Sequence, residues 1–120
     1  MYNNRFSNKA EEALRQAAAA ASALGQVYVG TEHILVGLLQ EGTSAAAQIL
    51  ENHGASRERV LALIRQLIAP ESPIRVADRS RYSPRAERVL ENSYKEAVQF
   101  KASLIGTEHI LIALLKDQEC

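Results

Sequence analysis

The sequence is poor in aromatic residues, glycine and proline. Only 5% of its 120 residues are aromatic, Trp is absent, and there are six Gly and three Pro. With 47% hydrophobic residues, a core has to be filled mainly by Leu, Ile, Val and Ala, which suits helices better than a sandwich or barrel of many short strands. Five consecutive alanines at 17–21 also favour helix. The composition therefore predicts one compact all-α domain.

The sequence also lacks net charge, paired cysteines and long apolar runs. Fourteen Lys and Arg balance fourteen Asp and Glu, so the chain lacks the basic surplus of proteins that bind nucleic acid. The single cysteine, Cys120, cannot form an internal disulfide. No stretch approaches the roughly 18 apolar residues of a membrane span, and no apolar region follows the first residues. We expect a cytoplasmic protein with neither nucleic-acid nor membrane partners.

One six-residue motif occurs twice. Gly-Thr-Glu-His-Ile-Leu stands at 30–35 and again at 106–111, an offset of 76 residues (106 minus 30). The same offset aligns the flanking residues without a gap: Phe6 with Tyr82, Ser7 with Ser83, Ala10 with Ala86, Leu14 with Leu90, and Leu24 with Phe100. The chain is therefore predicted to be two tandem, pseudo-symmetric helical repeats.

Capping residues and apolar periodicity predict the helices of each repeat. Four helices are expected in the first repeat: from Ser7 to Gly25, from Thr31 to about Gln40, from Ser44 to Gly54, and from Ser56 to about Ile68. Residues 69–81 contain two prolines and no periodicity, so they are interpreted as a linker. The second repeat opens at Ser83-Pro84, where proline suits the first helical position.

The second repeat is predicted to be incomplete. The counterparts of the third and fourth helices would lie beyond Cys120. We therefore expect the helix from Thr107 to about Lys116 to expose apolar surface. The sequence leaves open whether the chain is a cut piece of a longer protein or a naturally short protein.

These residues resemble a known family. Arg5-Phe6-Ser7, Tyr82-Ser83-Pro84-Arg85-Ala86 and the two Gly-Thr-Glu-His-Ile-Leu motifs resemble the duplicated N-terminal domain of Clp/Hsp100 AAA+ unfoldases, most closely the ClpC type. On this resemblance, residues 1–68 form the first Clp-N repeat, 69–81 the linker and 82–120 the second, shortened repeat of one compact domain.

The resemblance implies a recognition module without a cofactor. In this family the N-domain receives protein substrates and adaptors, and AAA+ ATPase modules then thread the substrates into a ClpP-type peptidase. The chain has no G-x-x-x-x-G-K-[ST] loop for nucleotide phosphates, so it is not predicted to be an enzyme. The alternative is a stand-alone accessory subunit that docks on a Clp protease complex. A plant or algal source would place the protein in the plastid stroma.

The resemblance also implies candidate binding residues for phosphoarginine, a degradation tag. Carried over by position, they are Glu32, Glu108, Ser7, Ser83, Val29, Gly30, Ile105 and Gly106. The two glutamates would pair with the guanidinium through charge-assisted hydrogen bonds, while a helix N-terminus and the serine hydroxyls would hold the phosphoryl group. A simpler interpretation is equally open, since an acidic residue in a first helical turn also complements the helix dipole.

The remaining polar motif residues have structural interpretations. Thr31 and Thr107 are expected to be helix caps. His33 and His109 lack a second ligand four residues away, so no metal site is predicted, and we expect buried imidazoles that are bonded to backbone carbonyls. An enzyme using Glu and His as acid and base would need a cleft, for which the sequence gives no sign.

Weaker candidates for contact with an adaptor lie at the two helix starts. They are Phe6, Tyr82, Arg81 and Arg85. The two aromatic residues could be hydrophobic staples of the helices or exposed anchors for the adaptor, and the sequence favours staples slightly.

Overall fold

The protein is a bundle of helices. The computed structural model describes residues 5–55, 58–60, 62 and 82–117. Its helices are α1 (Asn8–Ala23), α2 (Thr31–Glu41), α3 (Ala45–Asn52), α5 (Pro84–Gln99) and α6 (Thr107–Lys116), and residues 58–60 and 62 are also helical. Within these residues the only β-type pairing is two isolated bridges, so the prediction of an all-α fold is confirmed. The linker at 69–81 and Cys120 lie outside the described residues, so the repeat boundaries stay predictions.

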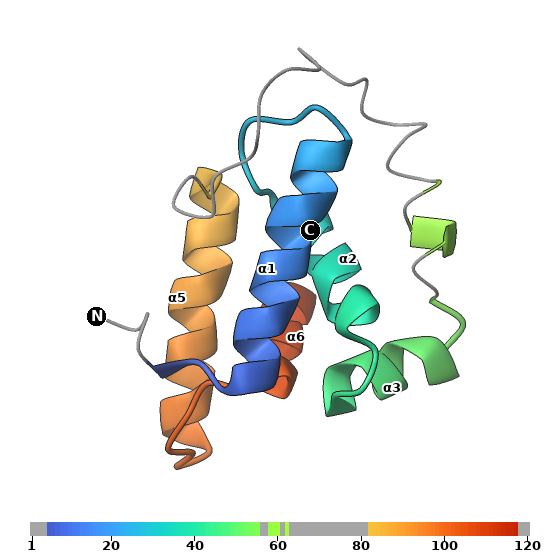
Figure 1. Cartoon of the computed structure of the whole chain (residues 1–120). Helices are drawn as coiled ribbons and strands as arrows, with labels where there is room; N and C mark the ends of the chain where they lie inside the picture. The colour runs from blue at the N-terminus through green and yellow to red at the C-terminus, as the bar shows by residue number, and fades with distance from the viewer. Residues whose placement is uncertain (1–4, 56–57, 61, 63–81, 118–120) are drawn as a thin grey trace.

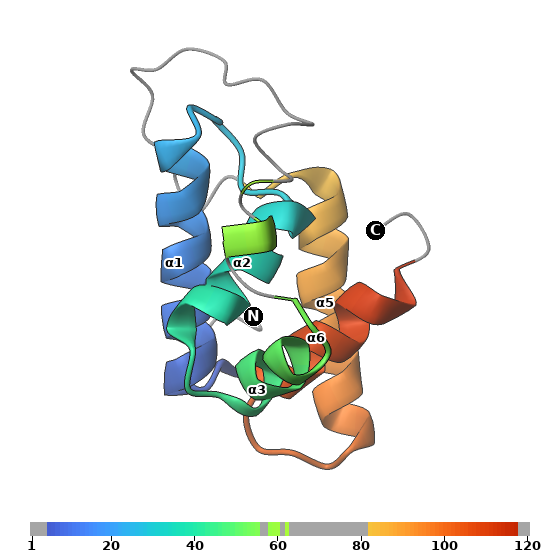
Figure 2. The same cartoon turned by 90° about the vertical axis from the view of Figure 1, so that its right-hand side faces the viewer.

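The helices form two pairs that follow the internal repeat. The long helix α1 packs on α2, and its counterpart α5 packs on α6. The pairs meet crosswise, since α1 contacts α6 and α2 contacts both α5 and α6. In Figure 1, α1 and α5 run in opposite directions, and Figure 2 shows α2 between them and α6 crossing in front of α5. The arrangement is that of two similar units facing each other across a pseudo-twofold axis.

Two short parallel bridges connect the repeats. Phe6 pairs with Ile105, and Val29 pairs with Tyr82. The Ser7 amide donates to the Ile105 carbonyl at 2.9 Å, and in the other bridge the Ser83 amide donates to the Val29 carbonyl at 2.9 Å. In each bridge, the residues that lead into a long helix of one repeat therefore pair with the residues that lead into a short helix of the other.

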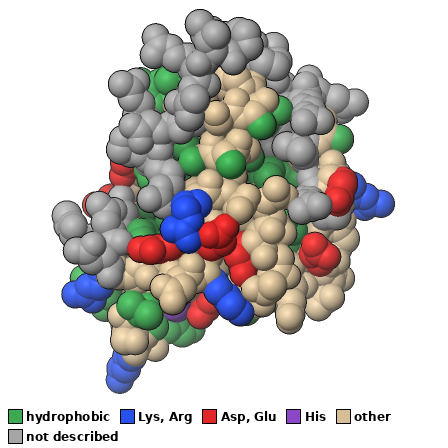
Figure 3. Space-filling view, viewed as in Figure 1, with side chains coloured by type: hydrophobic (Ala, Val, Ile, Leu, Met, Phe, Trp, Pro, Cys, Tyr) green, Lys and Arg blue, Asp and Glu red, His purple; other side chains and the backbone are tan. Residues whose placement is uncertain are grey.

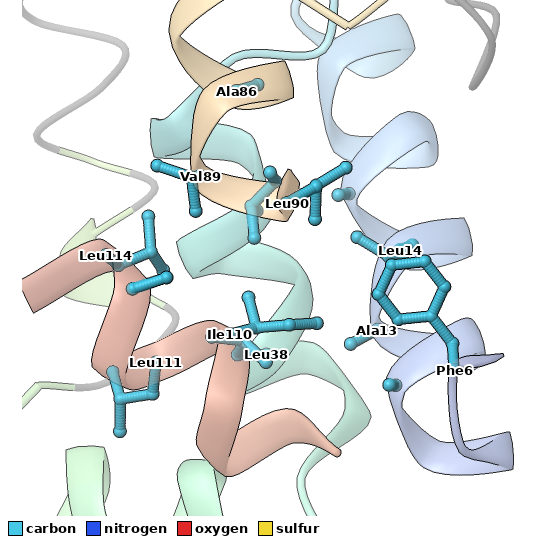
Figure 4. Packing of buried hydrophobic residues seen from close by; sticks show 14 of the residues in the cluster. Phe6, Ala13, Leu14, Leu38, Ala86, Val89, Leu90, Ile110, Leu111 and Leu114 are labelled. Carbon is cyan, nitrogen blue, oxygen red and sulfur yellow. The ribbon is translucent and has the colours of Figure 1, made fainter. Parts of the chain in front are cut away.

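One hydrophobic core spans both repeats. Leu14, Leu38, Leu90 and Ile110 are each at most 5% exposed and belong to a single cluster. Figure 4 shows that Ile110 of α6 and Leu38 of α2 lie next to each other. The two units therefore exclude water together rather than each forming a core of its own.

The two aromatic residues at the helix starts belong to this core. Phe6 is 8% exposed and lies in the cluster, so it does not serve as an exposed anchor for an adaptor. Tyr82 is half-buried and packs against the cluster. The staple interpretation therefore fits Phe6 better.

Serine caps and left-handed glycines set most helix ends, as predicted. Ser7, Ser44 and Ser83 accept hydrogen bonds from the amides three residues on at 3.1, 3.2 and 3.1 Å. Gly25 has a φ of 74°, in the left-handed region that ends helices. At the corresponding position of the second repeat, Lys101 has a φ of 59°.

The starts of α2 and α6 differ from the prediction. The N-caps are Gly30 and Gly106, and Thr31 and Thr107 are already inside the helices, so the prediction of threonine caps is wrong. The Gly30 amide donates to His33 Nδ1 at 2.9 Å, and the Gly106 amide donates to the histidine of the second motif at 2.8 Å. The histidine therefore does what Glu or Gln does in a capping box.

The hydrogen bonding of the motif histidines also needs correction. His33 and His109 are buried as expected, at 1% and 4% exposed. Their Nδ1 atoms, however, accept from a backbone amide instead of donating to a carbonyl. Only an imidazole with a lone pair at Nδ1 can do this, so the cap requires the neutral ring.

Gly37 lets α2 approach α1 closely. A Cβ atom at this position would lie 2.1 Å from the Ala13 carbonyl oxygen and 2.8 Å from the Ala17 amide nitrogen. Both atoms belong to a helix backbone, which cannot move aside as a flexible side chain does. The second repeat has Ala113 at the corresponding position, so this close crossing is specific to the first pair.

We expect Gly37→Ala to destabilise the protein by about 1–3 kcal/mol, the usual range for overpacking. The better helix propensity of alanine, about 1 kcal/mol, offsets this only in part. Urea unfolding followed by circular dichroism measures the change. The exposed α3 residue Gln48 provides a control, because Gln48→Ala should stay within about 0.5 kcal/mol of wild type. An unchanged stability for Gly37→Ala would contradict the close crossing.

The buried cap at His33 makes stability depend on pH. Burial lowers the pKa of His33 from its ordinary value of 6.5, although the Glu32 carboxylate opposes this. The unfolded chain therefore takes up a proton near pH 6.5, whereas the folded chain takes it up only at lower pH. The contribution of His33 to the free energy of unfolding is complete above about pH 6.5 and falls as the pH drops toward the lower, folded pKa.

We expect His33→Gln to weaken this pH dependence. Glutamine can accept the same hydrogen bond at this helical position and does not titrate. Between pH 7 and 5.5, wild type should lose stability more steeply than the variant, by at most about 1.4 kcal/mol per pH unit for one proton. Urea midpoints measured at several pH values test this. Parallel curves for the two proteins would show that His33 is not the titrating cap.

Candidate functional site

The two bridges build two related sites, each from both repeats. The first, the Glu32 site, brings Val29, Gly30 and Glu32 next to Ser83, whose amide bonds to the Val29 carbonyl. The second, the Glu108 site, has its own glutamate in α6, and the Ser7 amide bonds there to the carbonyl of Ile105. The sequence predicted these residues but not their pairing, which joins the glutamate of one repeat to the serine of the other.

Each glutamate side chain lies back across the start of its own helix. The Glu32 Oε1 atom is 2.5 Å from where a Cβ atom on Gly30 would be, and Glu108 has the same relation to Gly106. Any side chain at these glycines would therefore displace the carboxylate. Near the first amides of a helix a carboxylate is stabilised by the helix dipole. Glycine at the N-cap thus leaves room for an acidic group directly over the helix end.

A pocket of about 310 Å³ opens at the Glu32 site. Its lining residues are Gln26, Tyr28, Gly30, Thr31, Glu32, His33, Ser83, Pro84 and Arg85. The N-termini of α2 and α5 both border it, so two helix ends with partial positive charge face one cavity. An acidic and a basic side chain, Glu32 and Arg85, line the same space. The pocket therefore offers partners for a ligand that carries charges of both signs.

His33, one of the residues that line this pocket, has its ring fixed by the cap hydrogen bond. Its Nδ1 atom accepts from Gly30, so the proton of the neutral ring is on Nε2. That Nε2 atom is buried and has no hydrogen-bond partner among the described residues.

Acidic and basic side chains are mixed over the surface. Figure 3 shows both kinds scattered across the face viewed there, in keeping with the absence of net charge. Among the residues that the structure describes, no group of three or more His, Cys, Asp or Glu is placed to hold a metal ion. No helix in the described part of the chain is long and apolar enough to cross a membrane.

The Glu32 pocket brings together Gly30, Glu32 and Ser83 of the residues predicted to bind phosphoarginine. Arg85, proposed from the sequence as a contact for adaptors, lines the Glu32 pocket, whereas Arg81 lies outside the described residues. The sequence analysis missed Tyr28 and Gln26, which also line the pocket. Tyr28 is 55% exposed, and an aromatic residue two positions before the motif glycine was the signal that could have indicated it.

Known proteins with similar sequences are Clp chaperones. The family model described as the Clp repeat (R) N-terminal domain matches residues 5–120. The chain is 40% identical over 115 residues to the chloroplastic chaperone protein ClpC1 of Oryza sativa subsp. japonica, covering 96% of this chain and 12% of that protein. It is 37% identical over 119 residues to the negative regulator of genetic competence ClpC/MecB of Bacillus subtilis (strain 168), covering 99% of this chain and 14% of that one.

Solved structures with the same fold are N-terminal domains of related chaperones. The N-terminal domain of ClpD from Arabidopsis thaliana has a TM-score of 0.79 at 22% identity, covering 97% of this chain and 79% of that one. The Hsp104 N-terminal domain from Candida albicans has a TM-score of 0.74 at 25% identity, covering 96% and 76%. The present chain spans only 12–14% of the length of the two ClpC relatives. Its sequence and fold together establish that the chain belongs to the Clp repeat N-terminal domain family.

Proposed function

We propose that the chain is the substrate- and adaptor-recognition module of a ClpC-type unfoldase, and that it binds phosphoarginine-tagged proteins. The Clp repeat N-terminal domain is a non-catalytic module, so its contribution is binding. The observation that carries the proposal is the Glu32 pocket, where a carboxylate, two helix N-termini and a serine surround one cavity.

The pocket suits the chemistry of a phosphorylated arginine. Its volume of about 310 Å³ is at the lower end of the range for small-molecule sites, which matches a single modified side chain. The Glu32 carboxylate can accept two parallel hydrogen bonds from a planar guanidinium. The phosphoryl oxygens can then accept from the Ser83 hydroxyl and from amides at the helix ends. The guanidinium thus finds a carboxylate, and the phosphoryl group finds hydrogen-bond donors.

The proposal extends to the larger assembly. The relatives are several times longer than this chain, and the family resemblance implies AAA+ ATPase modules and a ClpP-type peptidase as their working partners. Adaptor proteins would bind the same domain. The relatives are named from a chloroplast and a bacterium, in agreement with a stromal or cytoplasmic location for this protein.

Calorimetric titration with free phosphoarginine tests the binding function. We expect saturable binding by wild type and a loss of at least tenfold in affinity for the double variant Glu32→Ala/Glu108→Ala, because about 1.4 kcal/mol per site is typical for removing a charged hydrogen-bond partner. Glu91→Ala, which removes an exposed carboxylate in the middle of α5, is the matched control and should bind as wild type does.

Unmodified arginine and inorganic phosphate serve as ligand controls. Each offers only half of the proposed contacts, so each should bind far more weakly than phosphoarginine. If wild type does not bind phosphoarginine, or if the double variant binds it equally well, the proposed phosphoarginine binding is rejected.

A further inference from the structure

The two sites have different walls although their motifs are identical. The offset of 76 places Ala102 where the Glu32 site has Gln26, and Leu104 where it has Tyr28. In the same way the Glu108 site has Lys9 in place of Arg85. The glutamate, the N-cap glycine and the serine are shared by both sites. The groups around them are not.

The cations of the two sites have different geometry. Arg85 lines the Glu32 pocket, and an arginine offers a rigid, planar fork of donors that fits phosphoryl oxygens in pairs. Lys9, which the offset places at the corresponding position, has a compact ammonium group without such a fork, and its Nζ donates to the Thr43 carbonyl at 3.3 Å. The Glu32 site consequently has the better anion-binding group.

The aromatic and imidazole groups differ in the same sense. The exposed ring of Tyr28 presents a face to which a guanidinium is attracted, whereas Leu104 offers only aliphatic surface. In the second repeat the ring of Phe100 lies 6.1 Å from that of His109, at the position where the first repeat has the buried Leu24. An aromatic ring with a polar group, Tyr28, therefore lines the Glu32 pocket, whereas the corresponding position of the second repeat is aliphatic.

We propose that the two sites are unequal and that the Glu32 site is the principal one for phosphoarginine. Tyr28 and Arg85 are its specificity-determining residues, and the Glu108 site binds the same group more weakly. This inference rests on the proposed function, because it assigns different affinities to the two sites for the ligand named there. A carboxylate, a serine and an aromatic ring line the pocket together with two helix ends, and this distinguishes the site from a bare helix end.

Single-site variants measure the two affinities separately. Glu108→Ala leaves the Glu32 site intact, and Glu32→Ala leaves the other. In calorimetric titrations with free phosphoarginine, we expect the Glu32→Ala protein to bind at least fivefold more weakly than the Glu108→Ala protein. Thermal melting checks that both variants are folded. Equal affinities would overturn the inference while leaving the proposed function standing, whereas no binding by wild type would reject both.

Exchanging the residues that differ between the two sites tests the roles of Tyr28 and Arg85. In the Glu108→Ala background, Tyr28→Leu with Arg85→Lys should lower the affinity of the Glu32 site about fivefold, to that of the Glu108 site. In the Glu32→Ala background, Leu104→Tyr with Lys9→Arg should raise affinity. The second exchange alters exposed residues only and keeps the test decisive if the first protein does not fold. No gain from it would overturn the role of the two wall positions.

Discussion

The pairing of backbone between the repeats is the constraint on which the rest of the structure depends. Two parallel bridges, Phe6 with Ile105 and Val29 with Tyr82, fix the long helix of each repeat against the short helix of the other. Because the residues flanking the bridges are N-caps, the same hydrogen bonds that join the repeats also bring helix ends together. Neither repeat contains a complete site by itself. Each site therefore requires both copies of the repeat.

Local features of this fold could be predicted from the sequence, and long-range ones could not. Serine caps at 7, 44 and 83 and the left-handed Gly25 act over a few residues, so their patterns were sufficient. The threonine caps were predicted wrongly because the N-cap lies one residue earlier, at Gly30, whose carbonyl accepts the first helical bonds and whose amide donates to His33. The crosswise pairing joins Val29 to Tyr82, and no local pattern indicates a contact over that separation.

Comparing the repeats shows which positions the fold constrains and which it leaves free. The caps, the motif glycines and the core leucines recur, since each is needed to start a helix or to exclude water. Other positions differ. Lys101 keeps the left-handed backbone of Gly25 at a cost of about 1–2 kcal/mol for a residue with a Cβ atom. The second repeat thus tolerates strain that the first avoids. The residues that line the two sites, such as Tyr28 and its counterpart Leu104, are also among the positions that differ between the repeats.

Because the bridges bring both repeats to the Glu32 site, a ligand bound there affects how firmly the two repeats are held together. A group held between Glu32 and Ser83 touches both repeats, so its binding free energy is added to the association of the two halves. Occupancy would therefore raise the cooperativity of unfolding as well as the stability. A force applied to a group held there would act on the two repeats together, because one core spans both.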